Sequence, residues 1–464
     1  GAMGKAQAEV KSDVENNLKL TTNDGDYWNK VLQDYKVKTS RLVVARASAS
    51  GFLPGNVWLV FCLSILLGII GALMYILPKM RHLPGIKNNH IFYSKLHHRG
   101  WLGILLGSYL IGFYILLYFF PEYLVSWIIL MDPVSHALNG GLASQWFLYG
   151  FLYTVAILVM GVRMMVKYRH NRYQLVRTGS VMFFQTAFAF LIPQVLALLN
   201  KPAPDLKSIW PLDYSFFFEY RLDELIQSGG LGIFMLVWGI ALFIIGVPVF
   251  TWLFGKRWYC SWVCGCGGLA ETLGDPFRQL SSKKLKAWKI ERWLIHAVLV
   301  FAVVMTVAVL GTYFTKNSQL LLIDSYTLRS WYGFAIGSIF AGVVGTGFYP
   351  LMGNRMWCRF GCPLAAYLGL VQKFKSRFRI TVNGGQCISC GNCSTYCEMG
   401  IDVRHYAQRG QDVVRASCVG CGVCAAVCPR GVLRLENNGS DAGSRTKQVR
   451  TVLIPESEVG LLNG

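Results

Sequence analysis

The chain has 464 residues, of which 53% are hydrophobic and only 15% charged, with 14 cysteines and a formal net charge of +21. A soluble protein is about 25% charged, so this composition excludes an ordinary soluble enzyme, a disordered chain and a small disulfide-stabilised scaffold. The basic excess points first to nucleic acid, but long apolar runs suggest that membrane topology placed the charge.

Residues 1–55 are predicted to form a polar N-terminal tail, because the first 50 residues lack the apolar core of a signal peptide. The apolar runs that follow are each close to the roughly 20 residues that a helix needs to cross a bilayer. Four of them lie in an N-terminal membrane region, 56–230, and three in a second membrane region, 231–375. The seven predicted spans are 56–77, 101–120, 145–166, 180–199, 231–254, 294–314 and 331–352.

The loops between the predicted spans alternate in charge. The loops after the first, third and fifth spans are rich in Lys and Arg, whereas the loop 121–144 has neither and the loop 200–230 has more acids than bases. Because basic loops remain in the cytoplasm, we expect a multi-pass protein of the bacterial inner membrane with its C-terminal region on the cytoplasmic side. Bases that follow topology rather than one groove-shaped face do not predict a nucleic-acid partner.

Three features in or beside the spans are interpreted as structural. His296, near the start of its span, is read as an interfacial or packing histidine rather than a haem ligand. Cys62, alone in the first span, is read as a small core residue. The aromatic-rich segment 209–220 is expected to cap the membrane surface, with docking of a partner as the alternative.

The region 376–436 contains eight cysteines in two copies of one spacing, Cys-x2-Cys-x2-Cys-x3-Cys. This is the spacing of bacterial two-cluster ferredoxins, in which the fourth cysteine of each run ligates the other cluster. Zinc does not need eight thiols in this double pattern, and disulfides are disfavoured in a reducing cytoplasm. We therefore expect an α+β ferredoxin domain with two 4Fe–4S clusters, followed by a flexible tail, 437–464. The predicted ligands are Cys387, Cys390, Cys393 and Cys428 for one cluster, and Cys418, Cys421, Cys424 and Cys397 for the other.

A second cysteine pattern is repeated at the ends of two predicted spans. Residues 255–265 align with residues 353–363, and each copy contains a glycine, an arginine, aromatic residues and a Cys-x3-Cys pair in register. Because two spans separate the copies, both pairs emerge on the same face of the membrane. The spacing i, i+4 also puts the two thiols of a pair on one side of a helical turn. Cys260, Cys264, Cys358 and Cys362 can therefore converge, with Cys266 as a fifth candidate.

The sequence leaves three interpretations of these membrane-edge thiols open. They form a further metal or Fe–S site, or a redox-active dithiol that exchanges electrons with the clusters or with a metal. The third interpretation is a purely structural interfacial turn held by Arg257, Arg355 and the aromatic residues.

Paired Cys-x3-Cys motifs at span ends, together with a two-cluster ferredoxin pattern, resemble those of the membrane polyferredoxin family. That family includes the quinol-dehydrogenase membrane component of periplasmic nitrate reduction, a nitrous-oxide-reduction membrane protein and a ferredoxin-like cytochrome oxidase assembly protein. The resemblance covers roughly residues 231–436. The chain departs from the family pattern at Gly265-Cys266-Gly267, where Cys-Pro is usual, and the first ferredoxin run ends in Cys397-Glu398.

These observations predict a membrane-bound electron-transfer subunit of an oxidoreductase complex. It would relay electrons between a quinone pool or membrane partner and a soluble redox partner. The basic cytoplasmic side would favour an acidic soluble carrier. Membrane lipid, other redox subunits and a quinone are the remaining expected partners. The alternative is an assembly factor that reduces a metal at the membrane-edge thiols for a respiratory metalloenzyme.

Overall fold

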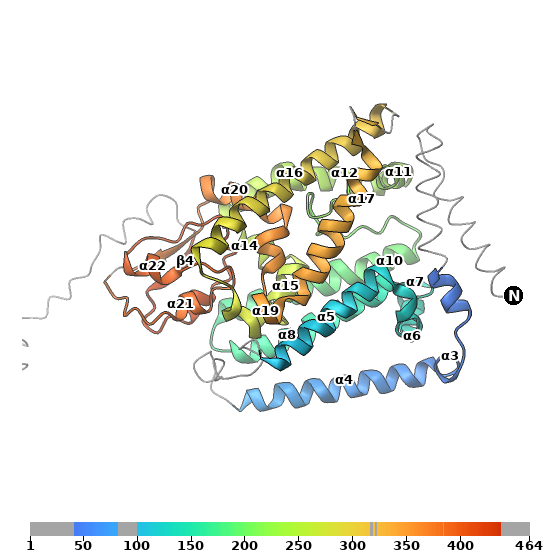
Figure 1. The fold of residues 1–464 in the computed structure, drawn as a ribbon, viewed down its shortest axis with the longest axis horizontal. Helices are drawn as coiled ribbons and strands as arrows, with labels where there is room; N and C mark the ends of the chain where they lie inside the picture. The colour runs from blue at the N-terminus through green and yellow to red at the C-terminus, as the bar shows by residue number, and fades with distance from the viewer. Residues whose placement is uncertain (1–40, 82–99, 316–318, 321–322, 384, 438–464) are drawn as a thin grey trace, which may run out of the picture.

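The computed structural model describes residues 41–81, 100–315, 319–320, 323–383 and 385–437, and most of them are helical (Figure 1). Six helical segments within these residues are long and apolar enough to cross a membrane. They are Val57–Pro78 of α4 (Val57–Met80), α5 (Trp101–Phe119), α8 (Gln145–Lys167), the continuous α9 (Arg172–Phe183), η5 (Phe184–Leu191) and α10 (Ile192–Leu198), the continuous α12 (Gly230–Ala241), η6 (Leu242–Gly246) and α13 (Val247–Phe254), and α16 (Leu285–Thr315).

The predicted count of seven spans is not confirmed, because the segment predicted at 331–352 is divided. It contains the end of α17 (Ser325–Tyr332), then η8 (Gly333–Val344), α18 (Gly345–Gly347) and α19 (Tyr349–Met352). The η8 segment is π-helical, and Phe348 separates α18 from α19 just before Pro350. A proline cannot donate a backbone hydrogen bond. The average hydropathy of a window does not register these interruptions.

Small residues allow this divided segment to lie close to α5. A side chain at Gly342 would overlap the ring of Tyr118, and one at Gly347 would overlap Ile111, both on α5. Tyr114 of α5 also donates a hydrogen bond to Thr346, with 3.2 Å between the oxygens. The segment is therefore packed inside the helical bundle, although its helix is not continuous.

The N-terminal helix α4 runs along the outside of the bundle (Figure 1). Its most apolar 18-residue stretch has no buried residue, although Ile76 near the end of the helix is buried. Cys62 on this helix is exposed, so the interpretation of Cys62 as a core residue was wrong. An exposed thiol on an apolar, outward-facing helix is a lipid-facing residue if α4 crosses the membrane.

Short helices connect the spans at both ends of the bundle. They are α3 (Phe52–Gly55), η4 (Pro121–Leu124), α6 (Val125–Leu130), α7 (Asp132–Asn139), α11 (Glu219–Gln227), α14 (Arg257–Cys260), α15 (Gly265–Thr272), η7 (Asp275–Leu280), η9 (Trp357–Gly361) and α20 (Pro363–Lys375). A two-residue pairing of β1 (Gln319–Leu320) with β2 (Ile323–Asp324) precedes α17. The aromatic segment 209–220 packs on the helices: the Trp210 ring lies 5.1 Å from Phe243 and the Tyr214 ring 5.1 Å from Tyr332.

The C-terminal cysteine-rich region forms a small unit at one end of the bundle (Figure 1). Strand β3 (Arg379–Val382) pairs antiparallel with β4 (Leu433–Glu436), so the two ends of the region meet. Three short helices, α21 (Asn392–Thr395), α22 (Val403–Gln408) and α23 (Val423–Ala426), lie between the strands. This is the α+β arrangement that the spacing predicted. The predicted domain boundaries stay predictions, and residues 1–40 and 438–464 of the predicted tails lie outside the described residues.

Candidate functional site

The first cysteine loop of the C-terminal unit lies on its outer side. The Cys393 thiol is within electrostatic range of the thiols of Cys387, Cys390 and Cys428, and burial raises the pKa of Cys393 to about 11. These are the four residues of the first predicted ligand set. Cys390 is exposed to solvent. Gly391 has φ of 79° at the start of α21, a left-handed conformation that glycine adopts without strain.

The second cysteine loop faces the membrane helices. Cys424 is buried within electrostatic range of Cys397, Cys418 and Cys421, the members of the second predicted set, and also of Cys393 from the first set. Gly422 starts α23 with φ of 75°, matching Gly391 in the first loop. The structure therefore brings the members of each set together and places the two sets side by side, although the cluster ligands themselves remain a prediction.

Backbone carbonyls of the second loop accept hydrogen bonds from the membrane region. Gln174 donates to the carbonyl of Cys421 at 2.9 Å, Ser261 to that of Val419 at 2.8 Å, and Gln372 to that of Cys418 at 2.9 Å. The donors lie on α9, directly after α14, and on α20. Because three separate elements hold this one loop, the second site is fixed to the membrane core while the first faces solvent.

The membrane-edge thiols converge on one cavity. Cys260, Cys264, Cys266, Cys358 and Cys362 all line it, together with apolar side chains that include Trp357 and Leu364. The paired cysteines are buried. The structure thus brings both Cys-x3-Cys pairs together, and Cys266 joins them as a fifth thiol.

The protonation preferences of these thiols differ. Burial raises the pKa of Cys260 to about 12, and it also raises the pKa of Cys358 and Cys362. The hydrogen bond that Cys266 donates instead lowers the pKa of Cys264 to about 6, against the effect of burial. Buried thiolates need a cation to compensate them, so a metal or cluster is the group that five thiols in an apolar cavity would accommodate.

The spacing of the thiols bears on which metal group fits. No three His, Cys, Asp or Glu side chains in the described part of the chain are placed to hold a single metal ion, and this includes the ferredoxin cysteines. A single zinc ion with bonds of about 2.3 Å draws its sulfur ligands within roughly 4 Å of one another. A four-iron cluster has a separate iron for each thiolate, so its ligands stand further apart. A single ion and a cluster therefore require different spacings of their thiol ligands.

A buried ionic network joins the ferredoxin unit to the membrane core. Glu398, which replaces the usual proline after Cys397, is 1% exposed. It accepts hydrogen bonds from Arg278 at 2.6 Å and from Arg355 at 2.9 Å. Burial raises the pKa of Glu398, but Arg278 and Arg355 outweigh it and lower that pKa to about 2. The departure from the family pattern therefore has a structural role, since Glu398 binds the repeated arginine of the second membrane-edge motif.

The network continues into the helical bundle. Arg355 also donates to Glu271 at 2.6 Å, and Glu271 pairs with Arg177 of α9. On the other side, Asp275 accepts from Lys167 at 2.6 Å and lies 3.0 Å from Arg163. Arg278 connects the two parts of the network, because it also donates to Asp275 at 2.9 Å.

Counted over these described residues, five cations face three carboxylates. Near Cys421 the charges balance, since Glu398 and Glu271 act on that thiol as well as Arg278 and Arg177, and the surplus cations, Arg163 and Lys167, lie around Asp275. The network therefore brings both signs of charge close to the second cysteine loop. The sequence alone did not reveal the network, because its members are spread from 163 to 398 and each is unremarkable by itself.

The repeated arginines of the two membrane-edge motifs have different partners. Arg355 is buried in the ionic network, whereas Arg257 lies over the ring of Phe378 at 4.6 Å and donates to Asn437 at 2.8 Å. Both arginines therefore connect the membrane edge to the ferredoxin unit, one through charge and one through an aromatic ring and an amide.

Comparisons with protein-family models agree with this arrangement. A 4Fe-4S dicluster domain model matches residues 386–433. A 4Fe-4S binding domain model matches residues 235–287 and 332–381, the two segments that contain the membrane-edge cysteine pairs. Two parts of the chain are therefore similar to 4Fe–4S domains, and six helical segments among the described residues are long and apolar enough to cross a membrane.

Two curated relatives carry ferredoxin-type or electron-transport names. The protein YccM of Escherichia coli, named as an electron transport protein, is 26% identical over 155 residues, which are 32% of this chain and 43% of YccM. The methylamine utilization ferredoxin-type protein MauN of Methylobacillus flagellatus is 29% identical over 165 residues, which are 32% of this chain and 51% of MauN. The matches thus span about half the length of each relative. The chain is thus similar, over about a third of its length, to proteins with ferredoxin-type or electron-transport names. No solved structure matches it.

Proposed function

We propose that the protein relays electrons between the membrane and a soluble carrier through two 4Fe–4S clusters, held by the predicted ligand sets. The main observation that supports this proposal is that the two cysteine loops have different surroundings. The loop of Cys418 is bound to membrane helices through its carbonyls, whereas Cys390 of the other loop is exposed. The cluster of the buried loop would receive or give electrons on the membrane side, and that of the exposed loop on the solvent side. When bound, each cluster carries one electron at a time.

On the membrane side, we propose a quinone pool or a membrane partner as the electron source or acceptor. A quinol gives up two electrons and two protons, so two one-electron clusters would take both electrons in sequence. On the soluble side, we propose an acidic flavodoxin- or ferredoxin-like carrier, which a chain of net charge +21 attracts. We also propose that the protein lies in the bacterial inner membrane with the ferredoxin unit in the cytoplasm.

Iron counting with electron paramagnetic resonance tests this proposal on the purified protein. We expect about eight irons per chain for two clusters, with signals of reduced 4Fe–4S centres after treatment with dithionite. A reduced soluble quinol analogue should then produce part of the same signal. Iron-free protein would overturn the proposal as a whole. If dithionite reduces the clusters but quinol does not, the quinone pool is not the electron source, and a membrane partner remains as the proposed source.

The second candidate function is metal reduction for the assembly of a respiratory metalloenzyme. The five-thiol cavity at the membrane edge favours it, because a soft metal such as Cu(I) prefers thiolate ligands. Copper titration of the purified protein separates the two functions. Stoichiometric copper that is lost in a C260S/C264S/C358S/C362S variant, without quinol-dependent cluster reduction, would favour assembly over electron relay.

A further inference from the structure

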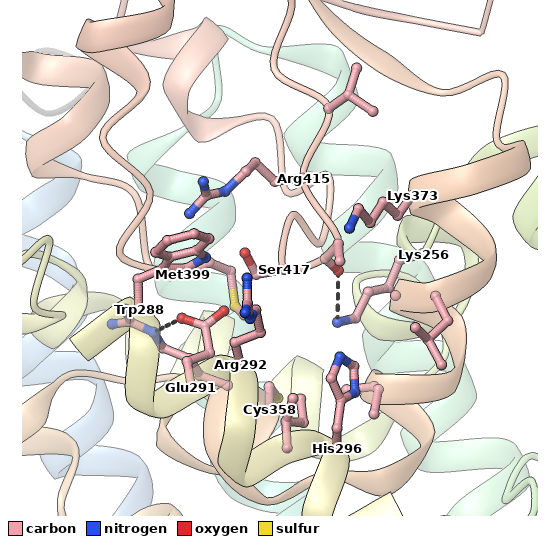
Figure 2. Close-up of a pocket in the computed structure, with 18 of the residues that line it drawn as sticks. Lys256, Trp288, Glu291, Arg292, His296, Cys358, Lys373, Met399, Arg415 and Ser417 are labelled. Atoms are coloured by element: carbon pink, nitrogen blue, oxygen red, sulfur yellow. Dashed lines mark hydrogen bonds and ion pairs between the residues drawn. The ribbon is translucent and has the colours of Figure 1, made fainter. Parts of the chain in front are cut away.

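A second cavity lies where the membrane helices meet the ferredoxin unit (Figure 2). Its volume is about 260 Å³, room for several water molecules at about 30 Å³ each. The walls come from the first turns of α16, from α20, and from the segment 414–417 that leads into Cys418. Cys358 of the membrane-edge site also lines it, so this cavity lies beside both cysteine sites.

The cavity is strongly basic. Lys256, Arg292, Lys373 and Arg415 line it, and Figure 2 shows these side chains around the same space as His296. In the described part of the chain, none of these four cations forms an ion pair with a carboxylate. The one acid in the wall, Glu291, is held by Arg359 at 2.5 Å. The site therefore presents several positive charges that no acid of the wall balances.

The Lys256 side chain and one ring nitrogen of His296 are held away from water. Lys256 is 1% exposed, and its ammonium group donates a long hydrogen bond to the carbonyl of Ala416 at 3.4 Å. The Nδ1 atom of His296 is buried with no hydrogen-bond partner among the described residues. Buried cations and donors without partners are costly unless something compensates them. An anion in the cavity would supply that compensation.

An apolar groove continues from the cavity along the outside of the bundle. Pro248, Val249 and Trp252 of α13 form one wall, and Leu370, Val371 and Phe374 of α20 form the other. Leu370 and Phe374 line both the groove and the basic cavity. Phe374 is 69% exposed. Because α13 ends a membrane-spanning segment, the groove lies where lipid chains would run.

We propose that the basic cavity binds the phosphate head group of an anionic membrane phospholipid, with an acyl chain in the groove. Basic pockets between membrane helices on the cytoplasmic side are suited to such head groups. The cations complement the negative charge of the phosphate. The groove gives apolar contact to an acyl chain, which a free phosphate does not have. A neutral quinone ring would leave four cations without a counterion, so the charge favours phosphate.

The bound phosphate would connect the two parts of the protein. Arg292 and Lys373 belong to the membrane-region helices α16 and α20, whereas Arg415 belongs to the ferredoxin unit. The guanidinium groups of Arg292 and Arg415 lie 5.8 Å and 4.8 Å from the centre of the Trp288 ring. One anion would therefore hold three cations that otherwise repel one another. The proposal is independent of the electron-relay function, since it concerns lipid binding alone.

Native mass spectrometry of the full chain tests the proposal. The protein would be transferred from nanodiscs of phosphatidylglycerol or of phosphatidylcholine, and an R292Q/K373Q variant compared with the natural sequence. K286Q/K289Q is the matched control, because it removes two exposed cations from the same end of α16 that do not line the cavity. We expect one retained phosphatidylglycerol per chain, with affinity roughly thirty-fold lower in R292Q/K373Q and unchanged in the control, since each cation near an anionic lipid is worth about fivefold.

Each other outcome overturns the assignment. Equal retention of phosphatidylcholine would show that charge does not select the ligand. Equal loss in both variants would show general surface attraction. Binding of inorganic phosphate to detergent-solubilised protein as tightly as the lipid would point to a free anion. A neutral isoprenoid quinone that binds in place of phosphatidylglycerol and is lost in R292Q/K373Q would show that the cavity takes a redox-active ring.

Discussion

At the scale of single residues, the position after Cys397 shows how one substitution of a family pattern acquires a role. The side chain of proline could not accept a hydrogen bond there, whereas the Glu398 carboxylate accepts from Arg278 and Arg355 and so ties the ferredoxin unit to the membrane edge. Removing one partner of a buried ion pair costs about 3–5 kcal/mol because the other charge is left uncompensated. Two arginines would each lose one of two carboxylate partners here, since Arg278 also binds Asp275 and Arg355 also binds Glu271.

We therefore expect E398Q to lower the free energy of unfolding by about 3–5 kcal/mol at neutral pH, measured as a fall in thermal midpoint of the ferredoxin unit. E224Q, which removes an exposed carboxylate paired with Arg221, is the control and should change stability by at most about 1 kcal/mol. A similar midpoint for both variants would show that Glu398 does not hold the unit.

The difference in stability between the natural sequence and E398Q should change with pH in one definite direction. The folded pKa of Glu398 is lowered from its ordinary 4.5 to about 2. A lowered pKa means that the contribution is fully present above the ordinary value and is lost as pH falls through the folded value. The stability gap between the natural sequence and E398Q should narrow as pH falls from about 4.5 towards 2, when urea unfolding is followed at each pH.

Lys256 is a second residue with a testable electrostatic role. It acts on Cys260 and Cys358 of the membrane-edge thiols and on Cys418 of the second predicted ligand set. Because a nearby cation favours the reduced, more negative form of a cluster, K256Q should lower a cluster reduction potential by on the order of 50 mV. Redox titration followed by electron paramagnetic resonance measures it. K256R should restore the potential, and K289Q, an exposed control, should leave it unchanged.

At the scale of elements, the repeated membrane-edge motif makes a prediction about iron. If Cys260, Cys264, Cys358 and Cys362 hold a cluster, replacing all four with Ser should remove about four irons and four sulfides per chain. C62S is the matched control, because Cys62 is an exposed thiol on α4. An unchanged iron content in the quadruple variant would exclude a cluster at these thiols. The redox-active dithiol and the structural turn would then be the remaining interpretations.

Elements also differ in how well the sequence predicts them. The ferredoxin loops and the repeat are set by local spacing, so the cysteines that meet were identifiable in advance. The division of 331–352 was not, because a π-helical stretch in η8 and the break at Phe348 depend on packing against α5. The network of Arg355, Glu271 and Glu398 was also beyond reach, since nothing local in the sequence indicates which of its distant members pair.

At the scale of the whole molecule, charge and cysteine placement together set the proposed path. Five thiols lie at the membrane edge, the buried loop of Cys418 lies next to them through Ser261 and Val419, and the exposed Cys390 lies on the outer side. The ionic network and the basic cavity surround the middle of this path. If electrons follow this proposed path, the cations of the ionic network would favour an added electron near them.

The same charge leads to a prediction for the soluble partner. An acidic carrier should be drawn to a protein of net charge +21, so its second-order rate of reduction should fall steeply as ionic strength rises, because the Debye length shortens from about 30 Å at 0.01 M to about 10 Å at 0.1 M. Stopped-flow mixing of the dithionite-reduced protein with an acidic flavodoxin measures this rate, and a basic cytochrome is the control. A rate for flavodoxin that rises with salt, or that falls no more than that for the cytochrome, would contradict electrostatic steering and require a different partner.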